Sequence, residues 1–434
     1  MKLQTILISL SIIFASGISA QEKPQQWNLA NCIEYALKNN IQIQQSKVTL
    51  ETSLVTTKQA KAQLLPNLSA GITQSFSNNP FTPANVYSGS YAINSSLLLF
   101  DGRKTGTNIR EQKLTEQANQ YAVLASEKSI QLSILQSYLQ ILYADESVKI
   151  NKATLDVSKF QLERGQSLLK AGSISKTDLA QLESQYSTDK YQLVTAENSL
   201  SSMKVQLKQL LELSVTDELN IVIPELNEVD VLKPLSSLQS IYENSLNVMP
   251  ALKSSKLNIQ MAGLETRKAK AGYLPTVSLN ASVGTNHSTV SSFNFGNQLR
   301  DGFNEGIGLS VSIPIFTNRQ TKSTVEKAVL NEKTSKLNLQ DAEKSLLKEI
   351  ESAYQDALSA QSQYLAAEEK VKALQTSYDL IDQQYKLGMK NTLELLTEKN
   401  NLLAAQQNLL QAKYLSLMNG QMLNLYQDLP LEIQ

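Results

Sequence analysis

Few residues of this chain belong to the types that perform catalysis or bind metals. The 434 residues include a single cysteine, Cys32, and a single histidine, His287. Disulfide frameworks, thiolate clusters and imidazole metal sites each need several such side chains, and no pair of nucleophile and base indicates an enzyme. We therefore expect no metal and no cofactor, a buried Cys32 on an apolar helix face, and an exposed His287 in a loop.

Residues 172–177 are similar to the end of an ATP-binding phosphate loop, with Lys176 and Thr177 in the last two positions. The segment lacks a glycine directly before Lys176, and the pattern before it predicts a helix where a phosphate loop requires a strand. We interpret the segment as a turn between helices. Any energy that the protein uses must then come from a partner.

Two such turns share one pattern of polar residues. New helices are predicted to begin at Ser175 and Asn391, and a glycine three positions earlier would end the preceding helix in each case. Asp178 and Glu394 each follow three positions after these cap residues, which is the spacing of a capping box. Capping alone explains both acids, and a second role in function remains open beside it.

Long helices are predicted on both sides of these turns. The ten prolines all lie outside residues 84–223 and 315–429, so residues 105–170 and 318–387 can each form one helix of about 100 Å at 1.5 Å per residue. The return helices are about half that length, and residues 29–63 and 238–272 are predicted as helices that stack on their ends.

A seven-residue apolar repeat runs along both return helices. It predicts either a coiled coil or the core of an ordinary helix bundle, and the repeat alone does not separate the two. Its members are Leu179, Tyr186, Leu193, Leu200 and Leu207, and then Leu396, Leu403, Leu410 and Leu417.

The chain contains an internal tandem repeat. Residues 29–70 match residues 238–279, and Ala60-Lys61-Ala62 recurs as Ala269-Lys270-Ala271. We divide the chain into a secretory signal peptide (1–20), a first repeat (21–214), an equatorial linker (215–234) and a second repeat (235–434). A doubled sequence of this length favours a pseudo-symmetric object such as a tube or ring.

Each repeat contains one predicted strand pair, within residues 67–100 and 276–316. Apolar residues alternate there with small polar ones, a pattern typical of transmembrane barrel strands, and a soluble sandwich edge is the alternative. Four strands cannot close a barrel, and open edges are not tolerated in lipid. Several copies must therefore share one barrel, and we favour a trimer because an eight-stranded dimer barrel would be filled by side chains.

Composition limits the partners. The chain has 40 basic and 40 acidic residues. It therefore has no net positive charge whose electrostatic field would attract nucleic acid, and no nucleic-acid partner is expected. After the signal peptide, no apolar run reaches the length of a membrane helix. If the mature protein enters a membrane, it must do so as strands.

The motifs together resemble one family. They are the doubled Ala-Lys-Ala-x-x-Leu-Pro, Leu98-Leu99-Phe100-Asp101-Gly102-Arg103, Ile313-Pro314-Ile315-Phe316-Thr317-Asn318-Arg319, and Ala171-Gly172 through Thr177-Asp178-Leu179. They resemble TolC-like outer membrane efflux proteins, and the resemblance covers essentially the whole mature chain. It implies a mixed α and β fold, mainly α, in which long coiled-coil helices form an α-barrel in the periplasm and four strands per chain contribute to a shared transmembrane β-barrel.

The resemblance also implies a function and partners. It predicts a homotrimeric channel-tunnel in outer membrane lipid that serves as the passive exit duct of a tripartite efflux or type I secretion system. A periplasmic adaptor protein and an inner-membrane pump would be its partners. The alternative is a structural coiled-coil outer-membrane stalk or adhesin, which would not need the strands. Export of drugs, metals or proteins remains equally open.

The resemblance assigns roles to residues at the two turns. It implies a periplasmic gate in which Asp178 hydrogen-bonds to Tyr385 and Lys390 binds near Thr177. This arrangement would tie the second turn to the first.

The resemblance further implies a constriction ring facing the lumen, to which Glu394 and Thr397 contribute. An acid is commoner at the position of Thr397, so the expected charge of the ring is halved.

Overall fold

The computed structural model describes residues 26–78, 86–224 and 228–431. Most of them are helical, and four strands form a single sheet. The prediction of a mixed, mainly α fold with four strands is thus confirmed. The predicted signal peptide lies outside the described residues.

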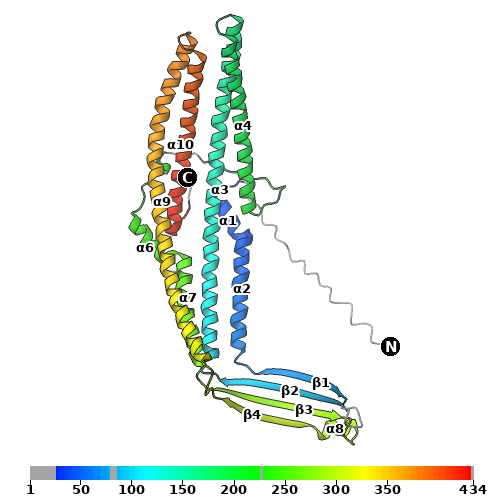
Figure 1. Cartoon of the computed structure of the whole chain (residues 1–434). Helices are drawn as coiled ribbons and strands as arrows, with labels where there is room; N and C mark the ends of the chain where they lie inside the picture. Colours follow the sequence, from blue (N-terminus) through cyan, green and yellow to red (C-terminus); the bar gives the residue numbers. More distant parts are fainter. Residues whose placement is uncertain (1–25, 79–85, 225–227, 432–434) are drawn as a thin grey trace, which may run out of the picture.

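The two halves of the chain follow the same order of elements, apart from α5 in the linker and α8 between the strands of the second half (Figure 1). The first half comprises α1 (Leu29–Asn39), α2 (Ile41–Ala62), β1 (Asn67–Ser77), β2 (Val86–Phe100), α3 (Lys104–Lys170) and α4 (Lys176–Leu210). After α5 (Glu228–Val231) come α6 (Leu238–Val248), α7 (Pro250–Ala271), β3 (Thr276–Ser288), α8 (Phe295–Asp301), β4 (Asn304–Ser312), α9 (Gln320–Lys386) and α10 (Thr392–Tyr426).

The long helices α3 and α9 contain 67 residues each and run along the whole helical part. The 35-residue helices α4 and α10 return along the half that is distant from the sheet. Helices α2 and α7 occupy the half nearer the sheet (Figure 1). The Nδ2 atom of Asn40 donates to the carbonyl oxygen of Leu210 at 3.0 Å, so α2 begins where α4 ends.

The two shorter helical segments are not continuous, although the sequence predicted one helix in each. Asn40 ends α1 and starts α2, where its side chain accepts a hydrogen bond from the backbone of Gln42. In the second half the break falls at Met249, because Pro250 occupies the first turn of α7 and has no N–H to continue the preceding helix.

The main apolar core lies where α1, α3, α4 and the linker meet. Ile134, Leu142 and Leu207 are fully buried there. Cys32 is also fully buried, as predicted, and its burial raises the pKa of the thiol to about 12. Trp27 pairs with Ile221 in an isolated parallel bridge, which joins the start of the chain to the linker.

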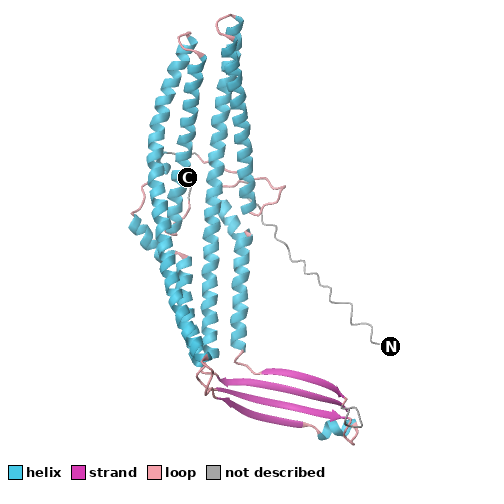
Figure 2. Ribbon diagram, viewed as in Figure 1, coloured by secondary structure: helices cyan, strands magenta, loops and turns pink. Residues whose placement is uncertain are grey.

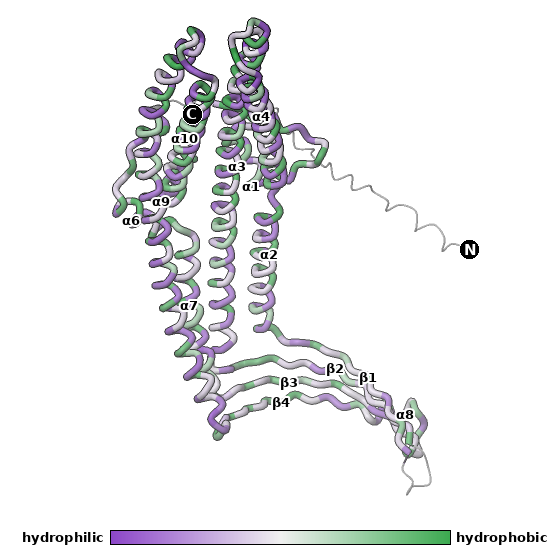
Figure 3. The backbone as a smooth tube through the Cα atoms, turned by 45° about the horizontal axis from the view of Figure 1, so that its top comes forward, coloured by the Kyte–Doolittle hydropathy of each residue, from purple (hydrophilic) through white to green (hydrophobic). Residues whose placement is uncertain are grey.

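The four strands form an antiparallel sheet in the order β1-β2-β3-β4, at one end of the helices (Figure 2). The register places Ile72 opposite Tyr91 and Ala281 opposite Ile307, so the apolar residues of neighbouring strands share one face. The other face carries small polar side chains, among which Ser96 donates to Asn280 at 2.8 Å. Hydrophobic positions recur along all four strands (Figure 3).

His287 corrects an expectation, because the predicted exposed loop position is wrong. The residue lies within β3, on the apolar face, and only 8% of its surface is exposed. Its ring stacks on Tyr91 at 5.9 Å and meets Phe295 of α8 edge to face at 4.9 Å. Gly89 lies opposite, and the space left by its missing side chain admits the imidazole.

Candidate functional site

The antiparallel pairs α3–α4 and α9–α10 are called hairpin 1 and hairpin 2 here, and the turns that join their helices are called the tips. Gly172 and Gly388 have φ values of 72° and 76°, the left-handed conformation that glycine adopts without strain. The backbone N–H of Ser173 bonds to the carbonyl oxygen of Leu168 at 2.9 Å. The left-handed glycines therefore end the two long helices at equivalent points.

Both return helices begin with the predicted capping box. The Asp178 N–H donates to Ser175 Oγ at 3.1 Å, and the Ser175 N–H donates back to Asp178 Oδ2 at 3.0 Å. Asn391 and Glu394 make the corresponding pair of bonds at 2.9 and 3.1 Å. Capping is therefore confirmed for both acids.

The capping acids are held in their charged forms. Hydrogen bonds from the Ser175 side chain and backbone lower the pKa of Asp178, with a small further contribution from Thr392 on hairpin 2. Lys390 lowers the pKa of Glu394 most, through an ion pair of 2.5 Å, and the Asn391 N–H adds to the effect. Both carboxylates therefore remain ionised at neutral pH.

A cleft of about 410 Å³ separates the two tips, and three of the four predicted gate residues line it: Asp178, Tyr385 and Lys390. Thr177 is not part of its wall. The Tyr385 hydroxyl is buried and has no hydrogen-bond partner within the described parts of the chain, so the expected bond to Asp178 is not formed here. Lys390 binds Glu394 of its own hairpin. The gate stays a prediction.

Near the tips, Arg164 Nη2 donates to the carbonyl oxygen of Lys386 at 3.3 Å, which joins the two hairpins. The predicted ring residues lie further along hairpin 2. Glu394 is about two-fifths exposed in its pair with Lys390, and Thr397 donates to the carbonyl oxygen of Leu393 in its own helix. A single chain does not arrange these residues around an axis, so the constriction ring also stays a prediction.

Sequence reasoning missed a buried polar cluster between the hairpins, which we call the cross-hairpin triad: Ser158 of α3, Asp189 of α4 and Lys399 of α10. Lys399 Nζ lies 2.5 Å from both Asp189 Oδ2 and Ser158 Oγ, and Ser158 also donates to Asp189. The Lys399 and Asp189 side chains are only 5% and 2% exposed. Removing one partner from a buried pair costs roughly 3–5 kcal/mol.

A signal for the triad is present in the sequence. Asp189 interrupts a second seven-residue line of apolar side chains on α4, formed by Leu182, Ala196 and Met203. An acid in such a line is costly unless a cation meets it. The sequence does not reveal that the cation is Lys399, which lies 210 positions away.

The polar contacts continue around the triad and toward the sheet. Gln185 Nε2 donates to Asp189 Oδ1 at 2.8 Å and to Asn400 Oδ1 at 3.2 Å, which adds a second link between α4 and α10. Further from the tips, Glu146 of α3 accepts from Lys413 and from the Tyr414 hydroxyl, both at 2.9 Å. The hairpins are thus tied along their length by side chains of opposite charge.

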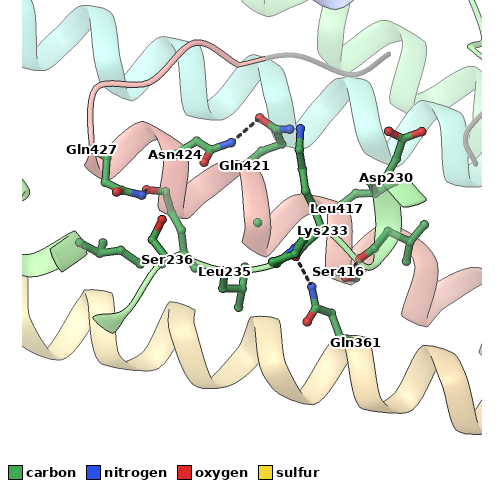
Figure 4. A pocket seen from close by; sticks show the side chains of 15 residues that line it. Asp230, Lys233, Leu235, Ser236, Gln361, Ser416, Leu417, Gln421, Asn424 and Gln427 are labelled. Atoms are coloured by element: carbon green, nitrogen blue, oxygen red, sulfur yellow. Dashed lines mark hydrogen bonds between the residues drawn. The ribbon is translucent and has the colours of Figure 1, made fainter. Parts of the chain in front are cut away.

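The linker is fastened to hairpin 2 around a small cavity of about 70 Å³ (Figure 4). Gln361 donates to the carbonyl oxygen of Lys233 at 2.9 Å, and Ser416 donates to that of Val231 at 2.7 Å. The cavity has room for about two waters, each of which occupies about 30 Å³ in the liquid. It is too small for an organic substrate.

None of the helices in the described part of the chain combines the length and the apolar character needed to cross a membrane. Within the same residues, no group of three or more histidine, cysteine, aspartate or glutamate side chains is placed to hold a metal ion.

Two long helical hairpins and an amphipathic four-stranded sheet at one end of the helices are thus the main features of the fold. A family model described as "Outer membrane efflux protein" matches residues 32–212 and 241–425. The chain therefore belongs to the outer membrane efflux protein family, as the sequence motifs indicated.

Relatives and solved structures agree with the family. The chain is 26% identical to outer membrane protein TolC of Escherichia coli over 432 residues, which cover 96% of this chain and 84% of TolC. It is 21% identical to proteases secretion protein PrtF of Dickeya chrysanthemi, covering 95% and 90% of the two chains. A crystal structure of CusC superposes with a TM-score of 0.80 at 19% identity, covering 92% and 91%. VceC of Vibrio cholerae gives 0.74 at 16% identity, covering 92% and 94%.

The family membership confirms the predicted localisation in the outer membrane, with the helical part in the periplasm. Its members and the structural neighbours are outer membrane channels rather than enzymes. The chain is therefore a member of a family of outer membrane efflux channels.

Proposed function

We propose that three copies of this chain form a channel-tunnel that is the passive exit duct of a tripartite efflux or type I secretion system. The observation that carries the proposal is the exposed apolar face of the sheet. Its apolar face is exposed along β1 and β4, where Ile72 and Ile307 are 73% and 77% exposed. Within the described residues nothing covers this face at β1 and β4, whereas lipid would.

The edges of the sheet require other copies. The outer edges of β1 and β4 have no partner strand in the described part of the chain. Unpaired backbone groups cost several kcal/mol each in lipid, so only a closed barrel is stable there. Twelve strands from three chains would close such a barrel around their small polar faces, and its interior would be wide enough for a channel.

The helices support the same assembly. Each chain provides four helical columns, two of 67 residues and two made of shorter helices that meet end to end. Twelve columns spaced about 10 Å apart form a ring with a hollow centre. Long coiled-coil helices would then continue the barrel as an α-barrel into the periplasm.

The tips would form the gate. Asp178, Tyr385 and Lys390 line the cleft between the tips, with Thr177 beside them, and the bonds of the closed gate would form across this cleft. Glu394 and Thr397 would contribute to the constriction ring. Contacts between exposed charges are weak in water, so an adaptor protein could override them. The chain has no phosphate loop, so an inner-membrane pump would supply the energy.

Purified protein in planar lipid bilayers tests the function. We expect a heat-sensitive oligomer on gels, small conductance steps for the unchanged chain, and larger steps for the variant D178A/Y385F. Glu183→Ala removes an exposed acid from the same helix and serves as the matched control, with unchanged conductance. A protein that inserts into the membrane without conducting would favour the stalk or adhesin. Conductance unchanged in D178A/Y385F would exclude the gate.

A further inference from the structure

The cross-hairpin triad is the most deeply buried charged contact between the two hairpins. Asp189 uses both carboxylate oxygens, since Oδ1 accepts from Gln185 while Oδ2 accepts from Ser158 and Lys399. Ser158 Oγ also lies 2.9 Å from the carbonyl oxygen of Thr154 in its own helix, an alternative acceptor for its single hydroxyl proton. Three helices, α3, α4 and α10, are therefore joined at one point.

Separating the hairpins at this point would be costly. Leu182, two turns before Asp189 on α4, and Leu402, one turn after Lys399 on α10, are buried, and burial already lowers the pKa of Lys399 against the opposing effect of Asp189. A shift of α10 along α4 would leave a carboxylate and an ammonium group apart in these surroundings. The charges at the tips differ, because the capping bonds of Asp178 and Glu394 lie within their own hairpins.

The triad also lies at a useful distance from the tips. Asp189 is about 20 Å into α4 from its first residue, Lys176, at 1.5 Å per residue. Between the triad and the tips, Gln161 binds the Tyr378 hydroxyl at 3.2 Å, and Arg164 binds the carbonyl oxygen of Lys386 at 3.3 Å. Neither of these contacts pairs two charged side chains.

We propose that Ser158, Asp189 and Lys399 form a pivot that keeps hairpin 2 attached to hairpin 1 while the tips separate. Movement is then confined to the residues between the triad and the tips. The three side chains are positioning residues, because they hold the helices that carry the gate and do not touch the cargo. The role of this movement in opening a gate rests on the proposed function. The attachment of hairpin 2 to hairpin 1 by the triad does not.

Hydrogen exchange of the assembled protein in detergent tests the attachment without any channel activity. In D178A/Y385F, we expect amides of residues 168–178 and 385–394 to lose protection, while those of residues 186–192 and 396–402 keep the protection of the unchanged chain. Equal loss of protection in both regions would show that the triad breaks on opening, which overturns the pivot.

Substitutions at the triad separate positioning from folding. Lys399→Met leaves Asp189 without its cation, so we expect a less heat-resistant oligomer and a larger conductance. The variant D189N/K399M removes both charges, and we expect it to regain heat resistance but to keep the larger conductance because the tie is lost. Lys372→Met removes an exposed lysine from an ion pair within α9 and is the matched control. Its conductance should not change.

A return of D189N/K399M to the conductance of the unchanged chain would mean that the charges matter only for folding, and the pivot would be rejected. If the unchanged chain forms no pore, the proposed function fails, while the exchange experiment still decides whether the triad holds the hairpins together.

Discussion

The helical core buries its apolar side chains, whereas the strand sheet leaves many of its apolar side chains exposed. Ile134 and Leu142 of α3 are fully hidden by other helices of the same chain, whereas Leu68 of β1 and Ile307 of β4 are each 77% exposed. Both regions contain apolar residues at regular intervals. The helical part therefore contains a core of its own, whereas the described part of the chain leaves the apolar side chains of β1 and β4 uncovered.

This difference separates the part that one chain stabilises by itself from the part whose apolar surface depends on its surroundings. An exposed apolar face of this extent is not stable in water and marks a surface that meets lipid or protein. The same kind of substitution should therefore have different effects on stability in the two regions.

The largest effect is expected in the core. Leu142→Ala removes a fully buried side chain and leaves a cavity, so the free energy of unfolding should fall by about 2–5 kcal/mol. Denaturant titration in detergent, followed by circular dichroism, measures the change. The exposed Leu330→Ala on α9 is the control and should cost far less; equal costs would contradict the assignment of the core.

Ile307→Lys tests the outer face of the sheet. A lysine that faces lipid near the middle of the membrane costs about 2–4 kcal/mol, whereas on a water-exposed strand it would cost almost nothing. We expect lower yield of assembled protein in the outer membrane and weaker refolding into vesicles. Ser310→Lys places the same charge on the polar face of the same strand and should be tolerated. Comparable behaviour of the two variants would argue against a lipid-facing sheet.

Gly89→Ala tests a tightly packed position in the sheet. An added Cβ would lie 2.2 Å from His287 Cε1, and such overpacking costs about 1–3 kcal/mol unless the ring moves. Thermal unfolding should show the loss. The double variant G89A/H287A should recover part of it, because the clash with the imidazole is removed while that with the Gln74 side chain remains. Purely additive effects would mean that Gly89 and His287 do not meet.

A smaller loss is expected at the helix starts. Ser175→Ala and Asn391→Ala each remove a side chain that accepts the N–H three positions later, which typically costs about 1 kcal/mol. Denaturant titration of the two variants should give similar losses, since the capping boxes are equivalent. Ser173→Ala, in the turn before the first box, is the control. If Ser173→Ala lowers stability as much as Ser175→Ala does, the capping bond does not stabilise the helix.

Cys32 should show an effect on reactivity rather than on structure. Burial raises the pKa of its thiol to about 12, while an unfolded thiol titrates near 8.5. Stability from the protonated thiol is therefore fully present below about pH 8.5 and is lost as the pH rises toward 12. At pH 9 an aromatic disulfide reagent should label the unfolded chain rapidly and the folded protein hardly at all. Rapid labelling of the folded protein would place Cys32 at the surface.

The sequence by itself determined the features that depend on neighbours in the chain. The absence of proline permitted α3 and α9, and the three-residue spacing of Ser175 and Asp178 predicted a capping box, because these signals act within one or two helical turns. The alternation along β1 and β4 likewise predicted strands with two different faces.

Only the tertiary structure decided the contacts between distant segments. It showed that His287 packs against Gly89 and α8, and that Asp189 meets Lys399 across the hairpins. A charge in an apolar line indicates that a partner is needed, but which of many lysines meets it depends on how the helices are aligned. That alignment is the sum of many weak packing contacts over the full length of α3, α4 and α10, and no short stretch of sequence contains it.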